Sequence, residues 1–279
     1  MRLQKIILCG LITLAISSCN NEAEKSPDGD KLDTASTEIK LKEEDITYTG
    51  DNTTMQGYLV YDENKKGPLP AVLVVHEWWG LNDYAKSRAK QLAGLGYVAM
   101  AIDMFGNGKT ADNPGDAGKL AGPFYENTTM AKARFDAALE KIKSYPQTDT
   151  SRIGAIGYCF GGAQVLNMAK LGDNLKGVVS FHGNLNVVPA NKDLLKAEIL
   201  VCHGAADPFV PQAEVDQFKK QMDSIGAKYE FKAYEGAVHA FTNPAATAAG
   251  EKFKIPIKYD AAADSASWND MKAFFRRVF

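Results

Sequence analysis

The sequence predicts an α/β protein with a doubly wound, mostly parallel sheet and helices on both faces. Short apolar runs rich in β-branched residues alternate with longer segments of helical periodicity, a pattern typical of parallel sheets. Ala71–Val75 has no polar residue, as expected of a strand buried on both faces. A glycine-flanked turn, residues 157–162, joins a strand candidate to a helix candidate. The length of 279 residues, 45% hydrophobic and 24% charged, suits one large globular domain.

The N-terminal segment has the features of an export signal. Arg2 and Lys5 precede an apolar stretch at 6–16, which fits a signal-peptide core and is too short to span a bilayer as a helix. The sequence Ile-Ser-Ser-Cys that ends at Cys19 resembles the lipobox of bacterial lipoproteins. The resemblance implies removal of residues 1–18, lipidation of Cys19, and an exported protein anchored to a membrane, facing the periplasm or the cell surface. A plain secretory signal with a chance cysteine at the cut is the alternative.

Residues 19–45 are polar and acidic, and too poor in large apolar side chains to offset the entropy of ordering. We expect a disordered acidic tether there, and a folded domain over 46–279. The domain opens with alternating apolar and polar residues at 46–49 and 56–61, which predict an antiparallel hairpin at a sheet edge.

The rest of the chain alternates between strand and helix patterns. Buried strands are expected at residues 71–75, 97–102, 152–156, 177–181, 198–202 and 229–234. Helices are expected at residues 83–93, 130–145, 163–170, 211–225 and 261–278. Residues 105–127 are rich in glycine and proline and predict a long loop or broken helix over one end of the sheet. Residues 242–260 look like a local insertion, and we expect this segment to cap the functional site.

The stretch Gly157-Tyr158-Cys159-Phe160-Gly161-Gly162 has the pattern of a nucleophile elbow in which the nucleophile is a thiol. A residue held in a strained strand-to-helix turn needs small neighbours so that backbone segments can approach closely. The N-terminus of the following helix favours the thiolate. A buried, unreactive cysteine at a glycine-rich turn is the alternative interpretation of Cys159.

Asp207 and His239 each follow a predicted strand, and both come after Cys159 in the chain. In α/β-hydrolases the order is nucleophile, acid and histidine, each on a loop at the carboxyl end of a strand. Singly, Asp207 could be a turn former before a proline, and His239 a surface-loop histidine. Together they predict a Cys–His–Asp triad on an α/β-hydrolase fold.

The loop after the predicted strand 71–75 supplies a second set of candidate residues. Glu77 could accept the thiol proton in the resting protein, unless it is simply a loop glutamate facing solvent. The backbone N–H groups of Trp78 and Phe160 are the expected oxyanion-hole donors. Aromatic side chains predict an apolar substrate pocket, with candidates Trp79, Tyr125 and Phe241.

These motifs, Gly-Tyr-Cys-Phe-Gly-Gly and His-Glu-Trp-Trp-Gly with Asp207 and His239, resemble the dienelactone hydrolase family (carboxymethylenebutenolidase-like). The resemblance covers roughly residues 46–279. It implies a carboxylic ester hydrolase in which Cys159 is the nucleophile, His239 the general base and then acid, and Asp207 its orienting partner. Glu77 would keep the resting thiol poised until substrate binds.

One departure from the family bears on the substrate. The family grips a substrate carboxylate with arginines, one of them shortly after the catalytic histidine. Here residues 240–243 read Ala-Phe-Thr-Asn, and residues 105–127 contain no arginine. Lys109 and Lys119 are candidate substitutes, although lysine lacks the bidentate geometry of arginine. We therefore expect a small-molecule ester or lactone substrate other than a dienelactone.

The remaining patterns favour few other functions. A net charge of −2 and the lack of a Lys/Arg cluster argue against nucleic-acid binding. No His, Cys, Asp or Glu spacing suggests a metal site and no glycine-rich loop suggests a phosphate site, so we expect no cofactor and no metal. We expect a monomer. His76 is expected to orient its loop, His182 to be a core or pocket residue, and Cys202 to lie in the core.

Three other functions stay open from the sequence. The domain could be a non-catalytic ligand-binding lipoprotein, although such a protein has no need of a complete triad. It could be a thiol redox sensor, for which Cys202 is the only candidate partner of Cys159. It could also be a peptidase-type acyl hydrolase.

Overall fold

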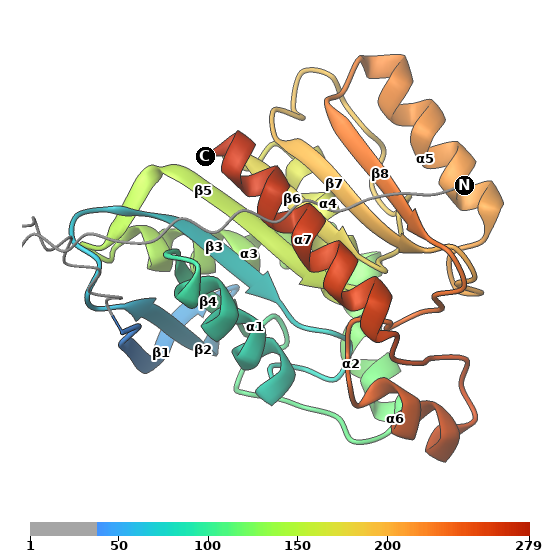
Figure 1. Ribbon diagram of the computed structural model, residues 1–279, viewed down its shortest axis with the longest axis horizontal. Helices are drawn as coiled ribbons and strands as arrows, with labels where there is room; N and C mark the ends of the chain where they lie inside the picture. The colour runs from blue at the N-terminus through green and yellow to red at the C-terminus, as the bar shows by residue number, and fades with distance from the viewer. Residues whose placement is uncertain (1–37) are drawn as a thin grey trace, which may run out of the picture. The chain divides into compact units, whose positions relative to one another are not determined.

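The computed structural model describes residues 38–279, which form an eight-stranded sheet in the order β1-β2-β4-β3-β5-β6-β7-β8 (Figure 1). β2 is antiparallel to both β1 and β4, and the other neighbouring pairs are parallel. The strands are β1 Leu41–Gly50, β2 Thr53–Asp62, β3 Leu69–Val75, β4 Val98–Ile102, β5 Thr148–Tyr158, β6 Gly177–Phe181, β7 Glu198–Gly204 and β8 Tyr229–Tyr234. The predicted mostly parallel α/β sheet is confirmed. The predicted signal peptide, Cys19 and the tether up to residue 37 lie outside the described residues.

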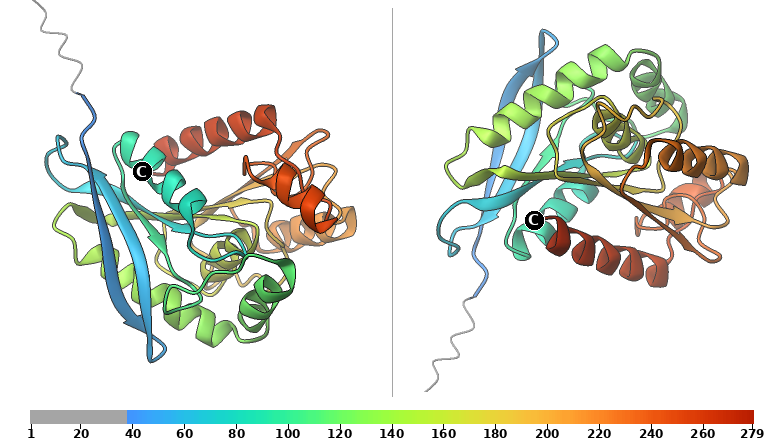
Figure 2. Two further views of the ribbon diagram at one scale, coloured as in Figure 1. Left: turned by 90° about the horizontal axis from the view of Figure 1, so that it is seen from below. Right: turned by 90° about the horizontal axis from the view of Figure 1, so that it is seen from above.

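Seven helices accompany the sheet within residues 38–279. They are α1 Asp83–Gly94, α2 Pro114–Glu126, α3 Thr128–Lys143, α4 Phe160–Lys170, α5 Gln212–Ile225, α6 Ala246–Phe253 and α7 Ala261–Val278. α1 and α7 cover one face of the sheet, and α3, α4 and α5 cover the other (Figure 2). Each face has its own apolar core, so the central strands β3, β4, β6 and β7 are buried on both sides along most of their length. No helix in the described part of the chain combines the length and apolarity needed to cross a membrane.

The edge hairpin is longer than the sequence predicts. β1 begins at Leu41 rather than at Ile46, so the last residues assigned to the tether pair with β2, starting from Leu41 opposite Asp62. The charged side chains of this part of β1 lie at the surface, where Glu43 forms an ion pair with Lys90 of α1. An edge strand with charged residues at its surface has the composition of a disordered segment, which explains the wrong boundary.

The glycine- and proline-rich segment 105–127 contains a regular helix, α2, in its second half. Asn113 caps this helix by accepting a 3.0 Å hydrogen bond from the N–H of Asp116, and Pro114 occupies the first turn. Asparagine as the cap and proline just inside the start are typical of a helix N-terminus. The predicted insertion 242–260 contains the short helix α6, which contacts Trp79 through Phe253.

The order of the strands places the functional loops together. β3, β5, β6, β7 and β8 are consecutive parallel neighbours, so their carboxyl ends lie along one edge of the sheet. In open parallel sheets ligands bind at that edge. The loops that follow β3, β5, β7 and β8 carry Glu77, Cys159, Asp207 and His239, respectively.

Candidate active site

Cys159 lies between the last residue of β5 and the first residue of α4, with φ 53° and ψ −114°. Its N–H lies 2.9 Å from the carbonyl oxygen of Phe181 and 3.1 Å from Nδ1 of His182. Positive φ is strained for a cysteine, and such strain is stored where surrounding contacts fix it. The geometry is that of a nucleophile elbow, which holds the side chain at the start of a helix.

Gly161 is required for the close packing of the elbow. A Cβ atom at this position would overlap the carbonyl oxygens of Val75 and His76, at the end of β3. The absence of a side chain therefore lets the loop after β3 lie directly against the first turn of α4. This approach brings Trp78 and Phe160 into the same part of the site.

His239 and Asp207 form a buried pair, with 2.8 Å between Nδ1 and Oδ2. The other carboxylate oxygen of Asp207 accepts a 2.8 Å hydrogen bond from the N–H of Phe209, so both oxygens are fixed. Burial disfavours a charged imidazole, but the Cys159 sulfur and the hydrogen bonds to Asp207 and Cys159 outweigh it. They raise the pKa of His239 to about 10. The three side chains predicted as a triad are thus brought together, with the imidazole between the thiol and the carboxylate.

Cys159 and His239 open onto a cavity of about 270 Å³. Its wall is mostly apolar and contains no lysine or arginine. The lining residues are Glu77, Trp78, Trp79, Gly118, Ala121, Gly122, Tyr125, Cys159, Asn184, Phe209, His239, Ala240, Ile255 and Ile257. Small apolar-lined cavities with a few converging polar groups are typical of small-molecule sites.

Glu77 is a buried carboxylate at this cavity, with 3% of its surface exposed. Its Oε2 accepts a 2.6 Å hydrogen bond from Nδ2 of Asn243. Burial raises the pKa of the Glu77 carboxyl to about 7, although the Asn243 hydrogen bond acts in the opposite direction. The alternative of a loop glutamate facing solvent is therefore wrong, and the carboxyl can change its protonation state near neutral pH.

His76 orients the Glu77–Trp78 peptide, as the sequence analysis expected. Its Nε2 accepts a hydrogen bond from the N–H of Met104, so Nδ1 carries the proton and donates to the carbonyl oxygen of Glu77 at 2.5 Å. Burial lowers the pKa of His76 to about 4, which keeps the ring neutral. Because the C=O and N–H of a trans peptide point in opposite directions, the bond to the Glu77 oxygen also fixes the N–H of Trp78.

The backbone N–H groups of Trp78 and Phe160 have no hydrogen-bond acceptor within residues 38–279. Phe160 is the first residue of α4, where N–H groups have no partner inside the helix. Two backbone donors without an acceptor, one in the loop after β3 and one directly after Cys159, are the kind of groups that an oxyanion hole requires.

Two of the three predicted pocket residues line the cavity. Trp79 and Tyr125 do so, whereas Phe241 does not. Phe241 is fully buried in the core beneath α7 and packs against His182 and Tyr234, with ring centroids 5.2 and 5.4 Å away. The preceding Ala240 has a φ of 58° and lines the cavity instead. The positive φ turns the chain after His239, and the phenyl ring then enters the core.

The two lysines considered as substitutes for the family's arginines do not reach the cavity. Lys109 is exposed and absent from the lining residues, and Lys119 forms an exposed ion pair with Asp116 on α2. Cys202 is buried in β7 as expected, and burial raises the pKa of its thiol to about 12.

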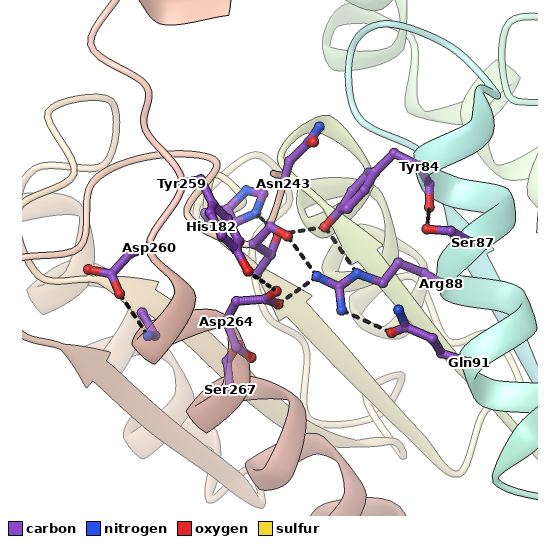
Figure 3. Close-up of polar contacts among 12 residues, drawn as sticks. Tyr84, Ser87, Arg88, Gln91, His182, Asn243, Tyr259, Asp260, Asp264 and Ser267 are labelled. Carbon is purple, nitrogen blue, oxygen red and sulfur yellow. Dashed lines mark hydrogen bonds and ion pairs between the residues drawn. The ribbon is translucent and has the colours of Figure 1, made fainter. Parts of the chain in front are cut away.

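His182 is a satisfied core histidine that links the elbow to the segment after His239. The Nδ1 atom of His182 accepts a 3.1 Å hydrogen bond from the Cys159 N–H. Its Nε2 atom forms a 2.7 Å hydrogen bond with the Thr242 hydroxyl. That hydroxyl also contacts the Tyr84 hydroxyl at 2.7 Å (Figure 3). Arg88 on α1 donates to the carbonyl oxygen of Thr242 at 2.6 Å and forms a buried ion pair with Asp264 of α7. A buried polar network thus joins both helices of one face to the site.

Several residues of the site were not predicted from the sequence. Asn243, Phe209, Ile255 and Ile257 contact Glu77 or line the cavity, and none was assigned a role. The position of Asn243 could have suggested a role at the site, because it lies in the segment after His239 where the family has an arginine and this chain has none. Ile255 and Ile257 follow α6, and no pattern in the sequence pointed to a role for them. In the described part of the chain, no group of three or more His, Cys, Asp or Glu side chains is arranged to hold a metal ion.

Comparisons with known proteins agree with this geometry. Residues 55–279 match the family model described as the dienelactone hydrolase family. Protein usf of Aquifex pyrophilus is 30% identical over 236 residues, covering 83% of this chain and 96% of that protein. A protein of Aquifex aeolicus with the provisional name carboxymethylenebutenolidase is 32% identical over 203 residues, covering 71% of this chain and 86% of the relative.

A solved structure from metagenomic libraries, described as a dienelactone hydrolase-like promiscuous phosphotriesterase, is also similar. It has a TM-score of 0.80 and 34% identity, covering 86% of this chain and 99% of the other. The match to the family model extends over most of the folded domain, including all four loops of the site. The chain therefore belongs to the dienelactone hydrolase family.

Proposed function

We propose that the protein hydrolyses small carboxylic esters or lactones through a thioester formed on Cys159. The observation that carries the proposal is the buried His239–Asp207 pair beside Cys159, at the wall of a small apolar cavity. A thiol, a base and an orienting carboxylate in this arrangement are the requirements of nucleophilic acyl transfer.

The reaction takes two steps. The Cys159 thiolate attacks the ester carbonyl while His239, whose raised pKa keeps it protonated, carries its own proton, and the N–H groups of Trp78 and Phe160 stabilise the resulting oxyanion. Collapse of the tetrahedral intermediate breaks the C–O bond, and the leaving alkoxide takes the proton from His239. A water molecule then attacks the thioester and gives its proton to His239. Collapse releases the acid, and Cys159 leaves as the thiolate.

We propose that Glu77 accepts the Cys159 proton in the resting enzyme, the role that the family resemblance implies. A carboxyl with a pKa of about 7 can take up and release a proton near neutral pH. Asn243 holds this carboxylate in place without contributing a positive charge.

The acyl group that fits the cavity is small and uncharged. Within residues 38–279, no lysine or arginine lines the cavity to pair with a substrate carboxylate, the His239 imidazole already bonds Asp207, and the buried Glu77 disfavours a second carboxylate nearby. We therefore infer that the substrate's acyl portion carries no carboxylate, in contrast to a dienelactone.

Neutral phosphotriesters are a second candidate class. The similar protein from metagenomic libraries is described as a promiscuous phosphotriesterase. A neutral triester presents no charge to the apolar wall, and its developing oxyanion could use the same two N–H donors. Turnover of a nitrophenyl dialkyl phosphate would support this class. Stoichiometric inhibition without turnover would restrict the enzyme to carboxylic esters.

We also propose that the mature protein is a monomer anchored to a membrane by lipid at Cys19, with the hydrolase domain facing the periplasm or the cell surface. The basis is the lipobox-like sequence and the preceding apolar stretch. Labelling of cells with a radioactive fatty acid tests it. The wild-type chain should take up label and Cys19→Ser should not, whereas equal labelling of the two would contradict the anchor.

A burst experiment tests the hydrolase. The domain lacking residues 1–19 is mixed with a short-chain p-nitrophenyl ester, and nitrophenolate release is followed within the first turnover. We expect a burst of one enzyme equivalent, lost when Cys159 is alkylated by iodoacetamide or changed to Ala. Cys202→Ala is the matched control and should keep the burst. Full activity in Cys159→Ala would contradict the mechanism. Binding of the ester without turnover would favour the non-catalytic alternative.

A further inference from the structure

A second cavity, of about 500 Å³, adjoins the cavity at Cys159. Tyr125 and Asn184 line both, so the two spaces meet at these side chains. The rest of the second wall comes from the loop after β6 and the start of α5. We call this space the polar groove, lined by Tyr125, Asn184, Asn186, Val187, Ala213, Glu214 and Gln217.

The polar groove differs chemically from the cavity at Cys159. Three carboxamides and one carboxylate line it, whereas tryptophan, isoleucine and phenylalanine dominate the other wall. The Oδ1 atom of Asn186 is buried and has no hydrogen-bond partner among residues 38–279. Buried acceptors without a partner are rare in folded proteins, and each needs an explanation. A hydroxyl donor from a ligand in the groove would supply the missing bond.

The backbone on both sides of Asn186 is fixed. Lys170 of α4 is almost fully buried, and its Nζ donates to the carbonyl oxygens of Leu185 at 2.6 Å and Val188 at 3.0 Å. From the other side, Glu214 Oε1 accepts the Leu185 N–H at 2.6 Å, and Asn186 Nδ2 donates to the Glu214 carbonyl oxygen at 2.7 Å. A loop held in this way presents its side chains without a further entropic cost on binding.

We propose that the polar groove binds the leaving alcohol of the substrate, and that this alcohol is an uncharged polyhydroxylated group such as a sugar. The proposal rests on the proposed esterase function. Amide and carboxylate oxygens are acceptors for hydroxyl groups, and amide N–H groups are donors to them. No lysine or arginine lines the groove, and the Glu214 carboxylate disfavours an anion. The acyl group would occupy the apolar cavity at Cys159, with the ester bond near Tyr125 at the junction.

The test uses two phenylacetate esters that differ only in the alcohol. One is the 6-ester of glucose, and the other is the cyclohexylmethyl ester, which has a similar ring but none of its hydroxyl groups. We expect kcat/KM to be about tenfold or more higher for the glucose ester, since each hydrogen bond to a polar group contributes a factor of a few. p-Nitrophenyl phenylacetate reports the chemical step independently.

Two variants locate the preference in the groove. Asn186→Leu and Gln217→Leu should each reduce the glucose-to-cyclohexylmethyl ratio by about threefold or more, and leave turnover of the nitrophenyl ester unchanged within about twofold. Gln212→Leu is the control, because Gln212 is an exposed glutamine of the same helix that does not line the groove. Gln217 is exposed, so Gln217→Leu decides the question even where Asn186→Leu fails to fold.

The outcomes separate the two proposals. Equal kcat/KM for the glucose and cyclohexylmethyl esters, with rapid turnover of the nitrophenyl ester, would overturn the alcohol site and leave the esterase in place. A preference for glucose that survives in both variants would also overturn it. A wild-type enzyme that turns over none of the three esters would overturn the esterase function and this proposal with it.

Discussion

The side-chain amide of Asn243 donates a 2.6 Å hydrogen bond to the buried carboxylate of Glu77, across 166 positions of the chain. The amide satisfies one oxygen but adds no charge. Burial disfavours the charged form more than Asn243, His239 and Arg88 favour it, so the pKa of the Glu77 carboxyl is raised to about 7. The pair therefore leaves the enzyme with a carboxyl that titrates near neutrality in the wall of the cavity that Cys159 also lines.

Replacement of Glu77 by glutamine should stabilise the protein at alkaline pH. The raised pKa means that the folded state keeps a proton that the unfolded chain has already released, so this group lowers stability as pH rises from about 4.5 to about 7. Glu77→Gln removes this loss and keeps an acceptor for Asn243. Its free energy of unfolding should exceed the wild-type value by about 1–3 kcal/mol near pH 8, and by little near pH 4.5.

Chemical denaturation at several pH values measures this difference. Glu251→Gln is the control, because it changes the net charge equally at an exposed position of α6. If the difference in free energy of unfolding between Glu77→Gln and the wild type does not grow with pH, ionisation of the Glu77 carboxyl does not destabilise the folded state. The same variant should lose esterase activity if Glu77 poises the thiol.

Asp207→Asn should lower kcat/KM by about 10²–10⁴-fold with little change in the melting temperature. The amide can donate to His239 Nδ1 and thereby favour the wrong tautomer, while the side chain keeps its shape. Asp216→Asn, on the exposed surface of α5, serves as the control and should retain activity. Wild-type kinetics in Asp207→Asn would remove this carboxylate from the mechanism.

Gly161→Ala should destabilise the elbow, because the added Cβ would overlap the carbonyl oxygens of Val75 and His76. We expect a loss of about 2 kcal/mol or more, as for other overpacked sites. Gly118→Ala on α2 is the opposite case. A Cβ there meets no atom within 4 Å, so the variant should be more stable by about 0.5–1 kcal/mol. Thermal and chemical unfolding of both variants checks the signs, and a neutral Gly161→Ala would contradict the close packing.

Arg88→Met should destabilise the protein by about 3–5 kcal/mol, because it removes the cation that pairs with the largely buried Asp264 carboxylate and the donor to the Thr242 carbonyl oxygen. The double variant Arg88→Met with Asp264→Leu should recover part of that loss. Lys86→Met, which removes a more exposed ion pair with Asp45 from the same helix, should cost less than about 1 kcal/mol. Equal losses for Arg88→Met and the double variant would show that the ion pair is not the source of the effect.

The parts of the fold that are predictable from the sequence are those with strong local patterns. β3, β4, β6 and β7 are buried along most of their length, so their apolar runs identify them. The order of Cys159, Asp207 and His239 after successive strands was enough to predict that they meet. The start of β1 at Leu41 was not predictable, because its surface-exposed charged residues have the composition of a tether. α2 was obscured by its glycines and by Pro123 within the helix.

The details of the site depend on contacts between distant segments. The direction of Phe241 is set by the positive φ of Ala240, which no pattern in the sequence reveals. The contact between Asn243 and Glu77 requires the segment after β8 to fold back over the loop after β3. The contribution of Ile255 and Ile257 depends on the path of the chain after α6.

The position of β5 and β8 in the sheet has a consequence for how activity responds to heat. β5, which ends directly before Cys159, is paired on both sides and buried in its second half, whereas β8, which precedes His239, is an edge strand with no fully buried residue. Edge elements with few buried contacts open by local unfolding well below the global transition. Fraying of β8 would withdraw the base from an intact nucleophile. Catalysis should therefore cease, and return on cooling, at temperatures at which most of the sheet is still protected from hydrogen exchange.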